Sequence, residues 1–516
     1  MRRCTNIIAI PMLAVGMLGT VAFARSESAV FRTFANPNMG ISGTTKQTAE
    51  LISLDGKPIS IPEMEAVVNG IMEKAGIPGL SCTIINSSKI AYRKTFGLKN
   101  KKTGEPNDEQ TIFAAASFSK IVFAYLVMLL VEKGVIDLDK PLHKYLKKPL
   151  PGYKKYADLK GDHRYKQITA RLCLSHSTGF PNWRFLTEDK KLKFLFDPGQ
   201  RHSYSGEGIH LLQMAVEEVT GKGLEELARE KVFKPLGMTQ TSYVWQDAWK
   251  ENAAIPHDQY ERPRRLDERR EADAAGSMFT TAGDYARLLV AIIGTDGKRK
   301  ATIDKMLHSQ VAIGYRNMFG PGAWQQTDEY EPIHLSWCLG WGRFDTTHGR
   351  AFFHTGHDFG WQNYTVTYAD KGIGLVFMSN SDNFESVARE LAKATIGDTY
   401  SPFDWLGYPH YDPNSKKEPP PPAPKAIDVD PSILKTYAST YDFAIADNMP
   451  TVKFEHGQLL VSNDQVQWVP LFAETQTRFF MKDEGYRFVF VTDNDRKVTH
   501  MNIEVDGVEI TGEKVK

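Results

Sequence analysis

Cysteine is scarce in this chain, with four residues among 516. Cys4, Cys82, Cys173 and Cys338 lie far apart and lack the paired spacing of a zinc site or of a disulfide framework. The sequence therefore predicts neither a thiolate metal site nor a fold held together by disulfides. We expect Cys173 and Cys338 to be buried apolar positions.

A large excess of charge of one sign is also missing. Lys and Arg number 63 and Asp and Glu number 62, which leaves a formal net charge of +1. Proteins that bind nucleic acid through phosphate contacts carry a basic excess, so we expect no nucleic-acid partner. The hydrophobic content of 41% is that of an ordinary globular protein with enough apolar residues for a core.

Beyond the N-terminus, no segment has enough consecutive apolar residues to cross a membrane. At the N-terminus, Arg2 and Arg3 precede an apolar run from Ile7 to Val21, and Ala22-Phe23-Ala24 has the pattern of a signal-peptide cleavage site. An uncleaved membrane anchor is the alternative, but the run is short for that role. We therefore expect a cleavable signal peptide at residues 1–24, a periplasmic or secreted protein, and no integral membrane segment after cleavage.

The length allows about three domains, or a large one and a small one. A proline-rich run at residues 418–424 marks a stiff linker, and the chain beyond it alternates apolar and polar residues between Gly, Asn and Asp turns. We expect a polar lead-in at 25–58, a large domain at 59–402, a proline-rich linker at 403–427 and a small all-β barrel at 428–516.

Strand patterns stand at both ends of the large domain and helical patterns between them. Ser60-Ile61-Pro62-Glu63 predicts a capping box that opens a helix. We expect a hairpin of strands at 80–85 and 90–96, helices at 209–219 and 224–232, strands at 351–354, 362–368 and 373–378, and a helix at 385–395. These elements predict an α/β (α+β) fold: an antiparallel sheet flanked by helices, with a helical subdomain inserted, followed by the barrel.

The most informative motif is Ser117-Phe118-Ser119-Lys120, which is followed by an apolar run at residues 121–130 that is suited to a buried helix. Ser117 and Lys120, three residues apart at the start of a helix, lie on one face, so the lysine amine is within reach of the hydroxyl. A serine becomes a good nucleophile only when a neighbouring base takes its proton. Ser432 and Lys435 have the same spacing, but no long apolar segment follows them.

A lysine acts as a base near neutral pH only if its pKa is lowered. The ordinary value of about 10.4 leaves roughly one molecule in two thousand neutral. Burial and a neighbouring cation or phenol lower it. The motif therefore predicts further residues that converge on Lys120.

Several stretches in order resemble the superfamily of class C β-lactamases, DD-peptidases and esterases, a family of serine hydrolases. Besides the motif, they are Cys173-Leu174-Ser175-His176-Ser177-Thr178-Gly179-Phe180-Pro181, Tyr204-Ser205-Gly206, Pro235-Leu236-Gly237-Met238-Thr239, Leu339-Gly340-Trp341-Gly342 and His354-Thr355-Gly356-His357. The likeness covers about residues 60–400. The tail after the proline run is similar to a lipocalin-like module.

The resemblance implies a role for each matched residue. Ser117 would be the acylated nucleophile, Lys120 its activating partner, and Tyr204 a second base that passes the proton to the leaving group. The backbone N–H groups of Ser117 and His357 would form the oxyanion hole. Whether Lys120 or Tyr204 takes the first proton stays open at this point.

Two residues depart from the family pattern. Gly206 stands where the Tyr-x-Asn motif of the family has Asn, which removes an amide that contacts the acylamino side chain of β-lactams. His354-Thr355-Gly356 replaces Lys-Thr-Gly, and a mostly neutral histidine holds a substrate carboxylate less firmly than lysine does. Both changes argue against efficient β-lactam hydrolysis and leave the acyl-transfer residues in place.

Other polar residues have simpler explanations. His354 and His357 have an H-x-x-H spacing, but residues three apart on a strand point to opposite faces, which argues against a shared metal. His176 is expected to be a structural loop residue. Glu207 and Trp361 are explained equally well as residues that line a cleft and as packed residues.

We therefore expect an exported, metal-independent serine hydrolase without a cofactor, which cleaves an amide or ester through a Ser117 acyl-enzyme. The substrate is a small molecule or a peptide, with peptidoglycan-derived molecules among the candidates. The alternative is a non-catalytic penicillin- or cell-wall-binding receptor on the same scaffold. The oligomeric state and the role of the barrel stay open.

Overall fold

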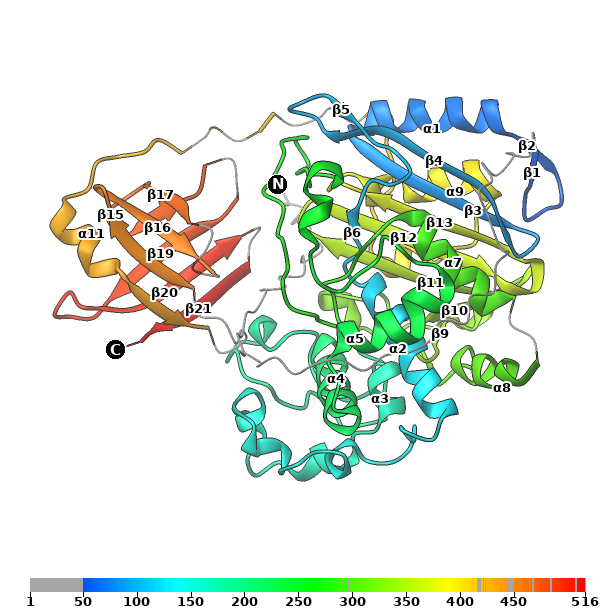
Figure 1. The fold of residues 1–516 in the computed structure, drawn as a ribbon, viewed down its shortest axis with the longest axis horizontal. Helices are drawn as coiled ribbons and strands as arrows, with labels where there is room; N and C mark the ends of the chain where they lie inside the picture. The colour runs from blue at the N-terminus through cyan, green and yellow to red at the C-terminus, as the bar shows by residue number, and fades with distance from the viewer. Residues whose placement is uncertain are drawn as a thin grey trace, which may run out of the picture.

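The computed structural model describes residues 50–294, 297–414 and 419–515, with short gaps at 421, 423, 444–449, 464, 466–467, 483–484 and 506–507. The expected signal peptide at 1–24 lies outside the described residues, and so does the lead-in up to residue 49. The described chain forms a large mixed α and β part and a β-barrel beside it (Figure 1).

An antiparallel sheet is the centre of the larger part. Among the described residues it has nine strands, in the order β5-β4-β3-β13-β12-β11-β10-β9-β8. The strands before the barrel are β1 (Glu50–Ile52), β2 (Pro58–Ser60), β3 (Gly79–Asn86), β4 (Lys89–Asn100), β5 (Glu105–Pro106), β6 (Phe113–Ala114), β7 (Phe279–Thr280), β8 (Val311–Ala312), β9 (Ser336–Trp337), β10 (Gly342–Thr346), β11 (Gly349–Asp358), β12 (Trp361–Tyr368) and β13 (Ile373–Ser379). β3 pairs with β13, so strands from the two ends of this part join in one sheet, as predicted.

The predicted hairpin is confirmed as β3 and β4. Ser87 and Ser88 form its two-residue turn with φ angles of 52° and 57°. Positive φ at both central residues is the backbone form that matches the right-handed twist of the strands. Serine adopts positive φ less readily than Gly or Asn does. The pairing of the two long strands holds both serines in this conformation.

Helices cover both faces of the sheet (Figure 1). They are α1 (Ile61–Ala75), α2 (Phe118–Glu132), α3 (Ala170–Leu174), α4 (Gly206–Thr220), α5 (Leu224–Ala228), α6 (Lys234–Leu236), α7 (Ala282–Ile293), α8 (Gly297–Met306), α9 (Ala388–Ile396) and α10 (Phe403–Leu406), with a π-helical turn at Arg229–Phe233. Short 3₁₀ turns lie at Leu142–Lys144, Leu150–Gly152, Lys154–Leu159, His163–Gln167, Arg184–Leu186, Asp247–Asn252, Pro321–Trp324, Glu331–Ile333, Ala369–Lys371 and Phe384–Ser386.

The segment after the motif forms α2, which is buried almost around its whole circumference. A helix that is apolar on all sides belongs in the interior of a large domain. It contacts β11 on one side and the helical subdomain on the other. Within the described residues, no helix is both long enough and apolar enough to span a membrane.

Three local predictions differ from the structure. The side chain of Ser60 does not cap α1, because Ser60 is the last residue of β2 and pairs with Glu50 of β1. The helix expected at 224–232 is divided by the π-helical turn. Ser432 and Lys435 do lie on a helix, but it is the short α11 (Pro431–Tyr437), and both side chains are exposed.

The span expected as a linker begins inside the core of the larger part. Phe403 and Trp405 of α10 are buried against the sheet, and Phe403 stacks on Tyr408 with ring centroids 5.6 Å apart. Burial of these aromatic side chains is favourable because it removes apolar surface from water. The linker that we propose between the two domains therefore begins after residue 408.

The C-terminal part is a closed barrel, as predicted. Its strands within the described residues number eight: β14 (Ser439–Asp442), β15 (Thr451–Glu455), β16 (Gln458–Ser462), β17 (Val469–Ala473), β18 (Arg478–Phe480), β19 (Arg487–Thr492), β20 (Val498–Val505) and β21 (Val508–Lys514). Tyr437 of α11 stacks on Phe490 with ring centroids 4.3 Å apart, so the helix packs onto the barrel interior. The barrel touches the larger part through Lys154 and Asp442, with Nζ and Oδ2 3.1 Å apart.

Candidate active site

Ser117 stands at the start of α2, directly after a strained residue. Ala116 has φ 47°, in the left-handed region that alanine seldom adopts. Such strain is found where the surrounding structure fixes a functional residue. The side chain of Ser117 does not cap α2. Instead, Ser119 Oγ donates to the Ala116 carbonyl over 2.6 Å and accepts from Met278 N over 3.1 Å, which holds this turn.

Lys120 is buried beneath Ser117, as the motif predicts. Its Nζ lies 3.1 Å from Ser117 Oγ and 2.5 Å from the carbonyl oxygen of Ala275. Burial lowers the pKa of Lys120 to about 7, although the negative charge of Asp273 acts in the opposite direction. A substantial fraction of this amine is therefore neutral near pH 7 and available as a base.

Tyr204 is the phenol that lies beside Lys120. The Lys120 Nζ is 5.0 Å from the centroid of its ring, and the His176 ring packs on it with centroids 4.2 Å apart. The Tyr204 hydroxyl is buried. Burial raises the pKa of Tyr204 above its usual value, while a hydrogen bond with Ser117 acts in the opposite direction. The phenol therefore keeps its proton at neutral pH.

Strand β11 passes directly against the segment that leads to Ser117. A Cβ at Gly356 would lie 2.6 Å from the Ala115 carbonyl oxygen, so only glycine permits this approach. Asn363 of β12 ties the same segment to the sheet, because its Nδ2 donates to the carbonyls of Ala114 and Ala115 over 3.1 and 3.3 Å. His354, Thr355, Gly356 and His357 are thus brought beside the start of α2, as the resemblance implies.

His354 is buried, and its ring carries no charge at neutral pH. Its Nδ1 lies 2.6 Å from the Thr355 carbonyl oxygen, and its ring packs 5.6 Å from Trp337. Burial lowers the pKa of His354 to about 3, with the Thr355 carbonyl opposing and the Lys120 charge adding to the effect. This position therefore offers no cation to a substrate carboxylate.

His357 lies on the other side of the strand and interacts with a different group. Its Nδ1 is 2.8 Å from Glu385 Oε1, and about a fifth of its side chain is exposed. Burial acts against the imidazolium, but the Glu385 carboxylate outweighs it and raises the pKa of His357 to about 9. The rings of His354 and His357 thus diverge, as expected for residues three apart on a strand.

Trp183 occupies the space beside Gly206, where the family pattern has an amide side chain. A Cβ at Gly206 would lie 2.3 Å from Trp183 Cη2 and 2.6 Å from two further ring atoms. The indole is nearly buried and lies 5.2 Å from the His210 ring, centroid to centroid. The absence of the Asn is therefore matched by a bulky ring that fills its place.

We predict that Gly206→Ala destabilises the protein by about 1–3 kcal/mol, because the added methyl group overlaps the Trp183 ring. Chemical denaturation measures the change. Gly70→Ala is the matched control: Gly70 is also helical, but its Cβ would meet nothing within 4 Å, so this variant is neutral or more stable. The cost of Gly206→Ala should shrink in a Trp183→Ala background. An equal cost in both backgrounds would refute the steric explanation.

The remaining polar candidates are structural. His176 accepts a hydrogen bond at Nδ1 from Ser205 N over 3.2 Å, which fixes the loop that carries Tyr204. Glu207 is buried in a two-pronged ion pair with Arg184, with Nη2 and Oε2 2.7 Å apart. Trp361 is buried edge-on to Phe113, so neither Glu207 nor Trp361 is an open cleft residue.

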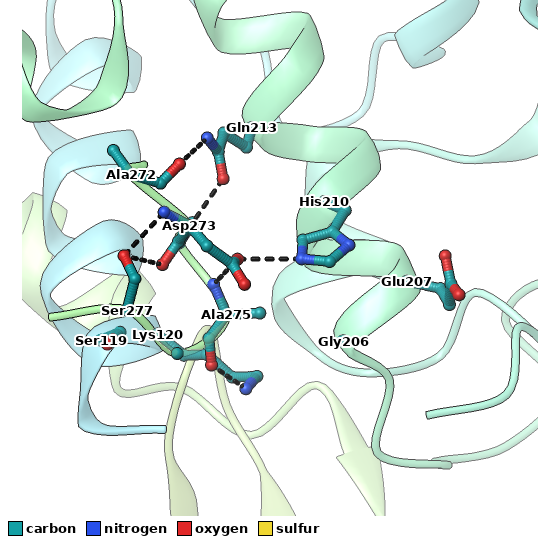
Figure 2. Close-up of polar contacts among 12 residues, drawn as sticks. Ser119, Lys120, Gly206, Glu207, His210, Gln213, Ala272, Asp273, Ala275 and Ser277 are labelled. Atoms are coloured by element: carbon teal, nitrogen blue, oxygen red, sulfur yellow. Dashed lines mark hydrogen bonds and ion pairs between the residues drawn. The ribbon is translucent and has the colours of Figure 1, made fainter. Parts of the chain in front are cut away.

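The sequence did not indicate Trp183, Asp273 or His210. Figure 2 shows Asp273 between His210 and Ala275, whose carbonyl binds Lys120. Trp183 and Asp273 lie in segments without a local pattern, and the helical pattern around His210 does not indicate its partner; only the folded chain brings the three into contact with the site.

Comparison with known sequences supports the resemblance. Residues 64–397 match the family model described as Beta-lactamase. Esterase EstB of Burkholderia gladioli is 25% identical over 322 residues, which cover 52% of this chain and 79% of the esterase. Penicillin-binding protein 4* of Bacillus subtilis is 23% identical over 451 residues, covering 81% of this chain and 91% of that protein. The human protein named Putative beta-lactamase-like 1 is 26% identical over 46% of this chain, and the match spans about half of its length (51%).

A solved structure shows the same fold. The octameric penicillin-binding protein homologue from Pyrococcus abyssi superimposes with a TM-score of 0.53 at 20% identity, over 87% of this chain and 99% of that one. The family match covers well over half of the chain. The chain therefore belongs to the beta-lactamase family, within the serine hydrolase superfamily.

Proposed function

We propose that this protein is an exported serine hydrolase that cleaves a carboxylic ester through an acyl-enzyme on Ser117. The observation that carries the proposal is the buried Lys120 amine, 3.1 Å from Ser117 Oγ, whose pKa burial lowers to about 7. A base with its pKa near the working pH is well suited to take the serine proton. The proposal that the protein is exported depends on the signal-peptide pattern at residues 1–24 of the sequence.

We assign the first proton transfer to Lys120. Ser117 Oγ attacks the ester carbonyl carbon, and its proton passes to the neutral Lys120 amine. Tyr204 has a raised pKa and keeps its proton, so it is less suited to be the first base. It can donate that proton to the departing alkoxide and recover one from Lys120, so the alcohol leaves neutral and the acyl group stays on Ser117.

Deacylation reverses these roles. A water molecule gives a proton to the Lys120–Tyr204 pair and attacks the acyl carbon. The bond between the acyl carbon and Ser117 Oγ then breaks, Ser117 Oγ takes the proton back, and the carboxylic acid is released. In both steps the backbone N–H groups of Ser117 and His357 would stabilise the oxyanion. One such donor contributes about 3–4 kcal/mol in other hydrolases.

Two features support esters over β-lactams and over peptides with a free carboxylate. Trp183 fills the space beside Gly206 where an amide would contact an acylamino group. His354 is neutral, so it provides no charge for a carboxylate. The relative from Burkholderia gladioli is named an esterase, which also supports an ester substrate.

A substrate panel tests the proposal. We expect turnover of a short-chain nitrophenyl ester, with a kcat/KM at least about tenfold above those for nitrocefin and for a D-alanyl-D-alanine peptide, because a difference of 1.4 kcal/mol in transition-state binding gives that ratio. A higher kcat/KM for nitrocefin or for the peptide would contradict the ester assignment and leave the acyl-enzyme proposal standing.

A further inference from the structure

Lys120 is anchored by a carbonyl from a distant segment. The loop at residues 272–277 places Ala275 O 2.5 Å from Lys120 Nζ, so one N–H of the amine is committed to Ala275. A neutral amine has two N–H groups and one lone pair. Because the Ala275 contact restricts how the amine rotates, it favours an orientation in which the lone pair faces Ser117 Oγ.

Asp273 shapes this loop. Its Oδ1 accepts from Ala275 N over 2.7 Å and lies 2.9 Å from His210 Nε2 (Figure 2). Its own backbone N–H donates to Ser277 Oγ over 2.8 Å. The Asp273 carboxylate therefore turns the chain so that the Ala275 carbonyl points at Lys120.

Helix α4 holds the loop from the other side. His210 and Gln213 lie three residues apart and share one face of α4. Gln213 Nε2 donates to the Ala272 carbonyl (Figure 2), and Gln213 Oε1 accepts from Ala274 N, both over 2.8 Å. The loop is thus bound to the helix that begins just after Tyr204.

His210 has a defined orientation. Its Nδ1 lies 3.2 Å from Lys155 Nζ. An ammonium group only donates, so Nδ1 is the acceptor and the imidazole proton is on Nε2, where it faces Asp273. A chain of contacts therefore runs from Lys155 through His210, Asp273 and Ala275 to Lys120.

We propose that Asp273, held by His210, is a positioning residue for Lys120, which keeps the amine within reach of Ser117 through the Ala275 carbonyl. The inference rests on the proposed function, since it concerns the base of that reaction. It adds two residues, half-buried and from different segments, that the family motifs do not contain.

The charge of Asp273 gives this role a distinctive signature. The titratable groups around Lys120 are Tyr204, His176, His354 and Asp273. Burial lowers the pKa values of both histidines, so both are neutral near pH 7. Burial raises the pKa of Asp273, but His210, the Ala275 N–H and Lys155 outweigh it and hold that pKa well below its usual range, so Asp273 stays ionised. It is thus the anion that raises the pKa of Lys120.

Removal of this charge should have an effect that mere loosening of the structure would not have. Asp273→Asn keeps an acceptor oxygen for Ala275 N and loses the negative charge. The pKa of Lys120 should then fall, and the acid limb of the pH–rate profile should move to lower pH by about half a unit or more. At pH 6 the variant should therefore react about threefold faster, relative to its own plateau, than the wild type does. Asp273→Ala also removes the acceptor, and its plateau rate should fall about tenfold or more.

The readout is the rate at which a fluorophosphonate phosphonylates Ser117, measured from pH 5 to 9 on the full chain. In this reaction Ser117 Oγ bonds to phosphorus, fluoride leaves, and the serine proton passes to Lys120. Glu218→Gln is the matched control, because Glu218 is also a carboxylate on α4 but accepts from Lys147 N and from the Tyr153 hydroxyl, and not from the loop at residues 272–277 or from Gln213. Its profile should match that of the wild type.

Each outcome has a consequence. An acid limb that moves in Asp273→Asn and not in Glu218→Gln supports the inference. If wild type is labelled and Asp273→Asn has the wild-type profile, the inference is wrong and the proposed function stands. If Ser117 of wild type is not labelled at any pH, the proposed function and the inference are both wrong. Asp273→Asn decides the matter even if Asp273→Ala fails to fold.

Discussion

Ser117→Ala lowers kcat/KM for the nitrophenyl ester by about 10⁴-fold or more, to the level left by binding and the oxyanion hole alone. The variant loses the atom that forms the acyl bond, and the nearby Ser119 cannot replace it. Ser119 Oγ is held between the Ala116 carbonyl and Met278 N. Steady-state kinetics at pH 8 measure the loss.

The chain offers a matched control for this variant. Ser432 has the same spacing to a lysine but lies on the exposed helix α11. Ser432→Ala should leave kcat/KM within about twofold of wild type, because a surface substitution away from the site has little effect. A Ser117→Ala variant that keeps more than a tenth of the wild-type rate would contradict the assignment of the nucleophile.

Lys120→Met abolishes turnover and, at neutral pH, raises the free energy of unfolding. The folded chain keeps Lys120 in a buried position where its pKa falls to about 7, below the ordinary value of 10.5. Burial of this ionisable group costs the folded state up to about 4 kcal/mol at pH 7. Methionine fills a similar volume without that cost, so loss of activity and gain of stability should appear together.

The stability difference between wild type and Lys120→Met should depend on pH. Between pH 7 and about 10, the unfolded chain binds a proton at Lys120 that the folded chain does not bind. The stability of wild type therefore rises with pH in this window relative to Lys120→Met, and the difference is constant below pH 7. Denaturation at pH 6, 8 and 9.5 should show the gap between the two proteins narrowing. A gap that does not change with pH would mean that Lys120 is not held at a lowered pKa.

The elements that carry the Ser117 motif could be predicted from the sequence because local signals agree there. The apolar run after Lys120 is typical of a buried helix, and α2 is one. The runs on either side of Ser87-Ser88 have the composition of strands, and they pair as β3, which is buried along almost its whole length, and β4. At both places a continuous apolar run favours burial, and the length of the run and its flanking turn residues favour a helix or a strand.

Other features depend on contacts between distant segments. Ser60 has the sequence of a cap, but its pairing with Glu50 in a small sheet takes precedence. The role of Gly206 appears only when Trp183, more than twenty residues earlier, is found against it. Asp273 reaches Lys120 through Ala275 across about 150 residues of chain. Neither composition nor spacing contains this information, because it arises from the tertiary packing.

The most direct test of the central claim is to trap the acyl-enzyme. The full chain is mixed with nitrophenyl acetate, quenched in acid within the first turnover, and analysed by intact-protein mass spectrometry and peptide mapping. We predict one acetyl group per chain, located on Ser117, and none on Ser117→Ala. No adduct on wild type, or an acetyl group on another residue, would contradict the account, and a complete lack of adduct would favour a binding protein on the same scaffold.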